Sequence, residues 1–76
     1  MMLTPAENDR RQLTLEFIVE RLGFVRAHAE VGQIEADVGD VTAVGYALQR
    51  ARMQLTAAID AYNQAAATKR GMPERG

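Results

Sequence analysis

Helix-breaking residues gather in one internal stretch of this chain, and that stretch constrains the fold more than any other feature. The two prolines, Pro5 and Pro73, lie near the ends of the 76 residues, whereas residues 32–40 contain two glycines and two aspartates. Such a cluster marks a connection between regular elements. The pattern predicts an all-α protein, a single domain in which two helices form an antiparallel hairpin. We expect a first helix over about residues 5–31, a connection over about 32–38, a second helix over about 39–70 and a frayed tail over 71–76.

Capping residues support both helix starts. Thr4 and Glu7 form a capping box around Pro5, which occupies the first helical position. At the second helix, either Asp37 or Asp40 can act as the N-cap, because a short carboxylate accepts hydrogen bonds from the amides of the first turn.

The apolar residues of both helices recur at helical spacing. We expect one stripe of the first helix to face the second helix, namely Leu15, Ile18, Leu22, Val25 and Ala29. The second helix carries one strong stripe, namely Val41, Val44, Leu48, Ala51, Leu55, Ile59, Tyr62 and Ala66. Antiparallel pairing about a centre near residue 35 sets Leu22 beside Leu48 and brings Glu20 near Arg50.

A second apolar stripe on the first helix has no partner within a hairpin. It consists of Leu13, Phe17, Phe24 and Val31 and contains both phenylalanines of the chain. Burial of one Phe side chain is worth about 1.5–3 kcal/mol, so we expect this stripe to be covered. The sequence therefore predicts self-association, most simply a homodimer that forms a four-helix bundle. The alternative is that a different protein covers the stripe.

Two glycines lie inside the predicted helices, where each costs about 1 kcal/mol relative to alanine. The expected register brings Gly45 near Val25, so we expect a close approach of the helices there. Gly23 lies toward the polar side of the first helix and has no such packing reason.

Catalytic chemistry has few residues to draw on, and we expect no enzyme, no cofactor and no metal site. The chain has no Cys and no Ser, and its one histidine is His28. The residue three positions before His28 is Val25, so the Glu-x-x-His spacing of bundle metal sites is missing. We interpret His28 as a boundary residue at the edge of the bundle.

Acidic residues dominate the connecting end. No Lys or Arg lies between Arg26 and Arg50, whereas four carboxylates do: Glu30, Glu35, Asp37 and Asp40. We expect this acidic end to attract a basic surface of a protein target. The alternative places binding on an exposed face of the second helix, through Tyr46, Arg50 and Met53. Single hairpins of this size are often small regulators or inhibitors, including those of phages and mobile elements, and we expect such a role.

The overall charge bears on the choice of partner. Nine Lys+Arg residues oppose ten Asp+Glu residues, for a net charge of −1, which disfavours nucleic acid as the main partner. A nucleic-acid-binding regulator that uses Arg50 and Arg52 of the second helix is the alternative function. No apolar run of about 18 residues is present, and residues 1–5 do not resemble a signal peptide, so we expect a cytoplasmic protein without a membrane partner.

Overall fold

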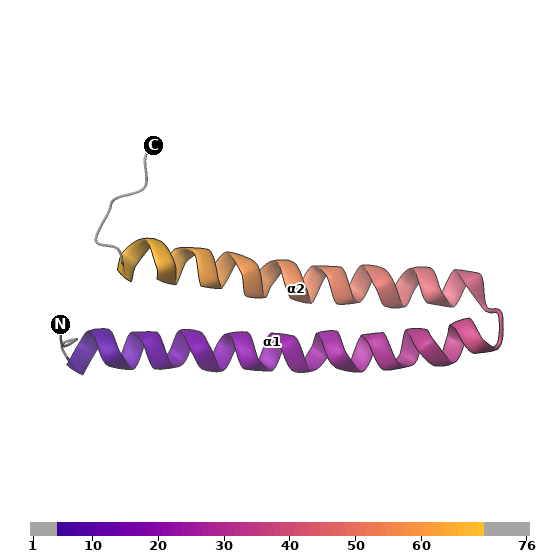
Figure 1. Ribbon diagram of the computed structural model, residues 1–76, viewed down its shortest axis with the longest axis horizontal. Coiled ribbons are helices and arrows are strands. Elements are labelled where there is room, and N and C mark those ends of the chain that lie inside the picture. The colour runs from indigo at the N-terminus through magenta and orange to yellow at the C-terminus, as the bar shows by residue number, and fades with distance from the viewer. Residues whose placement is uncertain (1–4, 70–76) are drawn as a thin grey trace.

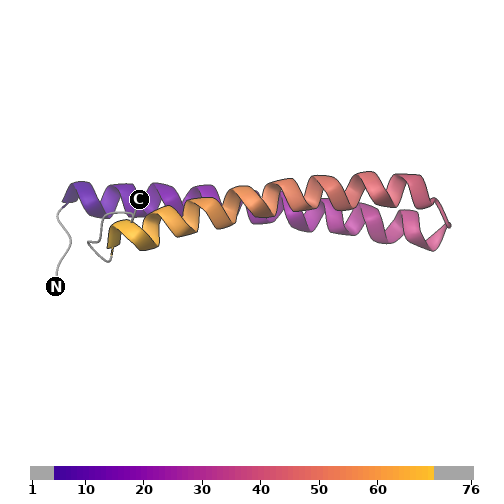
Figure 2. The same ribbon diagram turned by 90° about the horizontal axis from the view of Figure 1, so that it is seen from above.

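The chain forms two long helices that run antiparallel and are joined by a tight turn (Figure 1). The computed structural model describes residues 5–69, in which α1 spans Pro5–Asp37 and α2 spans Val41–Lys69. Seen from above, the two helices cross at a shallow angle (Figure 2). The predicted all-α hairpin is confirmed. Thr4, predicted to cap the first helix, and the tail over 71–76 lie outside the described residues.

The turn at residues 38–40 ends one helix and starts the next. Gly39 has φ +79°, a backbone conformation that costs a residue with a Cβ roughly 1–2 kcal/mol. Its amide donates to the Ala36 carbonyl at 3.0 Å, and the Asp40 amide donates to the Glu35 carbonyl at 2.9 Å, the pattern of a Schellman motif. The Asp40 Oδ1 accepts a hydrogen bond from the Ala43 amide at 3.1 Å. Asp40, rather than Asp37, is therefore the N-cap of α2.

The first helix is longer than predicted because Gly32 lies inside it. α1 continues past Val31 and ends at Asp37. A Cβ built on Gly32 would lie 3.3 Å from the Cβ of Ala47, so the missing side chain lets the two helices approach closely. Gly32 is thus a packing residue, and the predicted connection over 32–38 is in fact the last part of α1 and the start of the turn.

The seam between the helices repeats every seven residues. Arg21 Nη1 donates to Gln54 Oε1 at 2.9 Å, and this contact and the one between Gly32 and Ala47 set the register. Within the described residues only Ala47 and Ala58 are buried, at 5% and 4% exposed. The seam residues recur at alternating spacings of three and four and are mostly small or polar, namely Thr14, Ile18, Arg21, Val25, His28, Gly32 and Glu35 on α1 and Val44, Ala47, Ala51, Gln54, Ala58, Ala61 and Ala65 on α2.

The predicted register is wrong because the turn lies further along the chain than residue 35. Moving the turn of an antiparallel hairpin by one residue moves every pairing by two. The side chains of Leu22 and Leu48 are consequently both exposed rather than packed against each other across the seam. Glu20, expected near Arg50, pairs with Arg21 of its own helix at 3.2 Å. The large residues of the predicted stripes therefore lie mostly outside the seam.

The predicted close approach at Gly45 is also wrong. A Cβ on Gly45 would meet no atom within 4 Å, and the same holds for Gly23. In the observed register the tight position belongs to Gly32, so both other glycines face open space.

Candidate interaction surfaces

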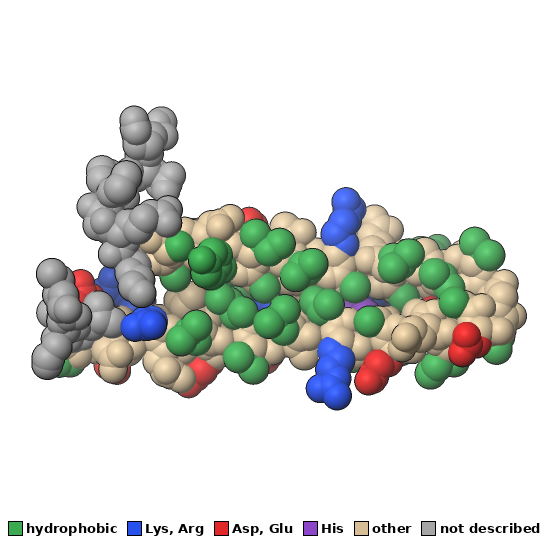
Figure 3. Space-filling model, viewed as in Figure 1, with side chains coloured by type: hydrophobic (Ala, Val, Ile, Leu, Met, Phe, Trp, Pro, Cys, Tyr) green, Lys and Arg blue, Asp and Glu red, His purple; other side chains and the backbone are tan. Residues whose placement is uncertain are grey.

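One side of the hairpin carries an apolar row from each helix. Leu22 follows the seam residue Arg21 on α1, and Leu48 follows Ala47 on α2. Because the helices are antiparallel, these two rows lie along the same side of the pair. Figure 3 looks onto this side and shows hydrophobic side chains gathered over both helices. We name it the leucine face and define it by nine exposed residues: Leu15, Val19, Leu22, Ala29, Val41, Leu48, Leu55, Ile59 and Tyr62.

The opposite side carries the residues that precede the seam on α1. Phe17 precedes Ile18 and Phe24 precedes Val25, and the two phenylalanines are 41% and 42% exposed. We name this side the phenylalanine face and define it by seven exposed residues: Leu13, Phe17, Phe24, Val31, Tyr46, Arg50 and Met53. The heptad positions therefore place the four residues predicted for self-association on the same side as the three α2 residues predicted for partner binding.

Arg21 connects the seam to the phenylalanine face. Its guanidinium lies 5.2 Å from the ring centre of Phe17 and 4.8 Å from that of Phe24, within the range of a cation–π interaction. The same group donates to Gln54 and pairs with Glu20, and the side chain is only 23% exposed. Arg21 thus fixes the two aromatic rings relative to the seam.

The seam itself is a weak source of stability. Arg21, His28 and Glu35 lie seven residues apart along α1, and Arg21 Nε and Glu35 Oε1 are buried without a hydrogen-bond partner. His28 is half-buried in the seam of the hairpin. Across residues 5–69, no group of three or more metal-ligating side chains could hold a metal ion.

The four carboxylates of the predicted acidic end differ in their surroundings. Asp40 caps α2, and Glu35 is half-buried in the seam. Glu30 lies 3.9 Å from the guanidinium of Arg26, and Asp37 is exposed in the last turn of α1. The structure therefore gives at least three of these residues local roles within the hairpin.

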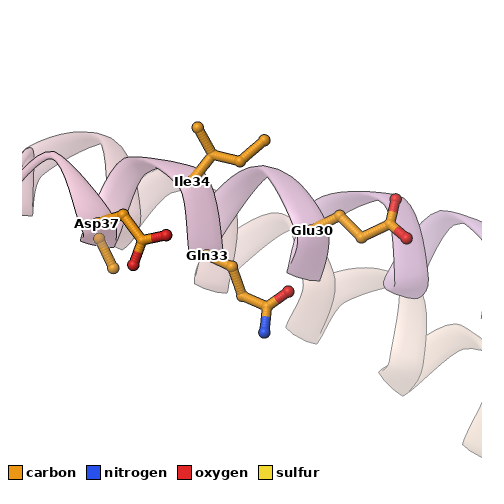
Figure 4. A pocket seen from close by; sticks show the side chains of 5 residues that line it. Glu30, Gln33, Ile34 and Asp37 are labelled. Carbon is orange, nitrogen blue, oxygen red and sulfur yellow. The ribbon is translucent and has the colours of Figure 1, made fainter.

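A shallow depression lies on α1 beside the turn (Figure 4). The labelled side chains of Glu30, Gln33, Ile34 and Asp37 all come from this one helix and point in different directions. A small-molecule site needs polar groups that converge in a concave, mostly apolar pocket. This depression does not provide such an arrangement.

The described part of the hairpin leaves large hydrophobic side chains exposed on both sides, among them Leu22 and Leu48 on the leucine face and Phe17 and Phe24 on the phenylalanine face. Monomeric proteins rarely leave large contiguous apolar patches open, so the two faces are the candidate binding surfaces of this protein.

Neither helix, within the described residues, has a stretch apolar and long enough to cross a membrane. Comparison of the chain with known protein families, with curated proteins and with solved structures found no match.

Reasoning from the sequence missed two features of these surfaces. The first is the role of Arg21, whose spacing to Phe17 and Phe24 by four and three residues is a recognisable signal for stacking on both rings. The second is the small-residue seam of α2. Alanines that recur at heptad spacing, namely Ala47, Ala51, Ala58, Ala61 and Ala65, could have indicated it.

Proposed function

We propose that this protein is a non-enzymatic interaction module that self-associates through one face and binds a protein target through the other. One observation carries the proposal: a hairpin whose only buried residues, within the described part of the chain, are Ala47 and Ala58 exposes large apolar residues on two opposite sides. Full burial of each Leu or Phe is worth about 1.5–3 kcal/mol, so covering these faces outweighs the contribution of the seam.

We assign self-association to the leucine face. Its apolar rows continue along both helices, and the two arginines beside it, Arg26 and Arg52, lie at its outer edges. Long arginine stems can lie on apolar surface while the guanidinium stays in water. The second apolar stripe of α1, which the sequence predicted for self-association, belongs to the phenylalanine face and is then available to bind the target.

The phenylalanine face has the composition of a heterologous interface. Tyr, Phe, Met and Arg are enriched at protein interfaces, and this face combines Phe24, Tyr46, Arg50 and Met53. We favour it over the acidic end, since Asp40 and Glu35 serve the turn and the seam. A small regulator or inhibitor that occupies an apolar groove of its target fits this surface.

Nucleic acid is the less favoured partner. Arg50 lies on the phenylalanine face, whereas Arg52 lies at the edge of the leucine face on the other side of α2. The two residues therefore do not form one basic surface, and phosphate binding needs clustered positive charge.

Sedimentation equilibrium of two matched variants tests the self-association. Leu22→Gln with Leu55→Gln places one polar residue on each helix of the leucine face, and Leu13→Gln with Met53→Gln does the same on the phenylalanine face. We expect twice 8.4 kDa for the natural chain and for the second variant, and a single-chain mass for the first. A natural chain that is a fully helical monomer at micromolar concentration would contradict the proposal, and dissociation of the second variant alone would move self-association to the phenylalanine face.

Target binding is tested by capture from host extract. We expect the natural chain to retain a protein that Tyr46→Ala with Met53→Ala no longer retains. Retention by this variant, together with loss in Glu30→Lys with Asp37→Lys, would return the binding site to the acidic end.

A further inference from the structure

We infer that Gln54 of α2 is a positioning residue for the phenylalanine face, because it holds the Arg21 guanidinium in the place from which this group stacks on Phe17 and Phe24. The two aromatic rings of α1 then keep their positions only while α2 is packed in the observed register. The consequence for target binding rests on the proposed function.

The guanidinium of Arg21 serves two rings of its own helix at once. Phe17 precedes Arg21 by four residues and Phe24 follows it by three, so the rings lie on either side of it along α1. The guanidinium carbon is 5.2 Å from the centre of the first ring and 4.8 Å from that of the second. A movement of the guanidinium along α1 toward one ring would therefore weaken its contact with the other.

Two polar contacts hold this guanidinium, and they differ in strength. Nη1 donates to Gln54 Oε1 at 2.9 Å in part-buried surroundings, and the positive charge of the donor strengthens this bond. Nη2 lies 3.2 Å from Glu20 Oε1, but the Glu20 side chain is 63% exposed, and exposed ion pairs contribute little. Arg21 Nε is buried and donates no hydrogen bond. Gln54 is thus the main polar anchor of Arg21, and it belongs to the opposite helix.

Loss of this anchor would free the rings as well as the arginine. The Arg21 side chain has several rotatable bonds and could turn toward Glu20 and water. Phe17 and Phe24 are both exposed, so they would lose the neighbour that restricts them. A protein that binds the phenylalanine face would then have to order both rings itself, which lowers affinity. Gln54 therefore contributes to this face without lying on it.

Proton NMR of the Arg21 side chain tests the positioning directly. Protons that lie above an aromatic ring shift upfield, so we expect upfield Arg21 signals and nuclear Overhauser contacts to both rings in the natural chain. Gln54→Met keeps the length of the side chain but removes the acceptor oxygen, and it should lose these signals. Gln54→Glu keeps an acceptor oxygen and should retain them.

Gln49→Met is the matched control, because Gln49 is an exposed glutamine of the same helix. All variants are compared at equal helicity by far-UV circular dichroism, and Gln54→Ala, which suits a seam of alanines, replaces Gln54→Met if the latter loses helicity. Unchanged Arg21 signals without the acceptor oxygen overturn the inference. Equal loss in Gln54→Glu also overturns it, because the effect would then not depend on the hydrogen bond.

The consequence for binding is measured with the protein that the natural chain retains from host extract. We expect Gln54→Met to bind it about tenfold more weakly, and Gln54→Glu and Gln49→Met to bind it as the natural chain does. Natural affinity in Gln54→Met, with the Arg21 signals displaced, would restrict Gln54 to the seam and overturn its role at the phenylalanine face. If the natural chain retains no protein, the proposed function fails, whereas the NMR spectra still decide whether Gln54 positions Arg21.

Discussion

Gly32 sets the distance between the two helices, and its replacement gives a graded test of the seam. An alanine in place of glycine inside a helix stabilises the folded state by about 0.5–1 kcal/mol. At Gly23 nothing lies within 4 Å of the added Cβ, so Gly23→Ala should gain this amount and raise the melting temperature by about 4–8 °C per kcal/mol. At Gly32 the added Cβ would lie 3.3 Å from the Cβ of Ala47. We expect Gly32→Ala to show almost no net gain, because the helices must shift slightly apart.

Gly32→Leu extends the series by adding atoms for which the seam has no space. Overpacking of a tight position costs about 1–3 kcal/mol, and we expect a loss of that size. Urea denaturation followed by far-UV circular dichroism measures all three variants, at one fixed chain concentration because the proposed self-association would shift the midpoint. If Gly32→Leu is as stable as the natural chain, the helices do not approach at Gly32 and the register described above is refuted.

Three further predictions concern single side chains. Arg21→Ala should destabilise the hairpin by about 1–2 kcal/mol, because it removes the hydrogen bond to Gln54 and the stacking on Phe17 and Phe24, whereas the exposed Arg11→Ala should change stability by less than about 0.5 kcal/mol in the same urea titration. Asp40→Ala should cost about 0.5–2 kcal/mol through loss of the N-cap bond to Ala43, and thermal melts should show no comparable loss for Asp37→Ala; equal losses would contradict the assignment of the cap. Gly39→Ala should cost about 1–2 kcal/mol because of its φ of +79°, and Gly39→Asn should cost less in the same melts, since Asn tolerates this conformation better.

The helices and their antiparallel arrangement followed from the sequence because local signals specify them. Strong helix formers fill both segments, and one cluster of glycine and aspartate separates them. The exact position of the turn within that cluster was harder to predict from the sequence. Gly32 and Gly39 both read as helix stops, and only the contact of Gly32 with Ala47, which belongs to the other helix, distinguishes a packing glycine from a terminating one. An error of one residue in the position of the turn shifts every pair of facing residues by two. The uncertain position of the turn therefore made the whole predicted register wrong.

The rows of side chains were predicted more reliably than the direction in which each row faces. Leu15 and Leu22 share one row, and Phe17 and Phe24 share another, as the helical spacing indicates. Apolar residues cover much of α1, so hydrophobicity alone does not show which row meets α2. The alanines of α2 determine which row of α1 packs against that helix, because small residues allow a closer approach than leucines. On α1 the matching small residue is Gly32, which lies against Ala47.

Because the alanine seam buries little side-chain surface, we expect the folded fraction of this protein to depend on the concentration of the chain. A hairpin in which Ala47 and Ala58 are the only buried residues among those described draws little stability from within one molecule. In the proposed dimer, folding and association therefore form one bimolecular equilibrium, and the folded fraction rises with chain concentration by mass action. The phenylalanine face, which Arg21 holds against the seam, is then displayed only above a threshold level of the protein. A regulator built in this way would respond to its own expression level without any separate switch.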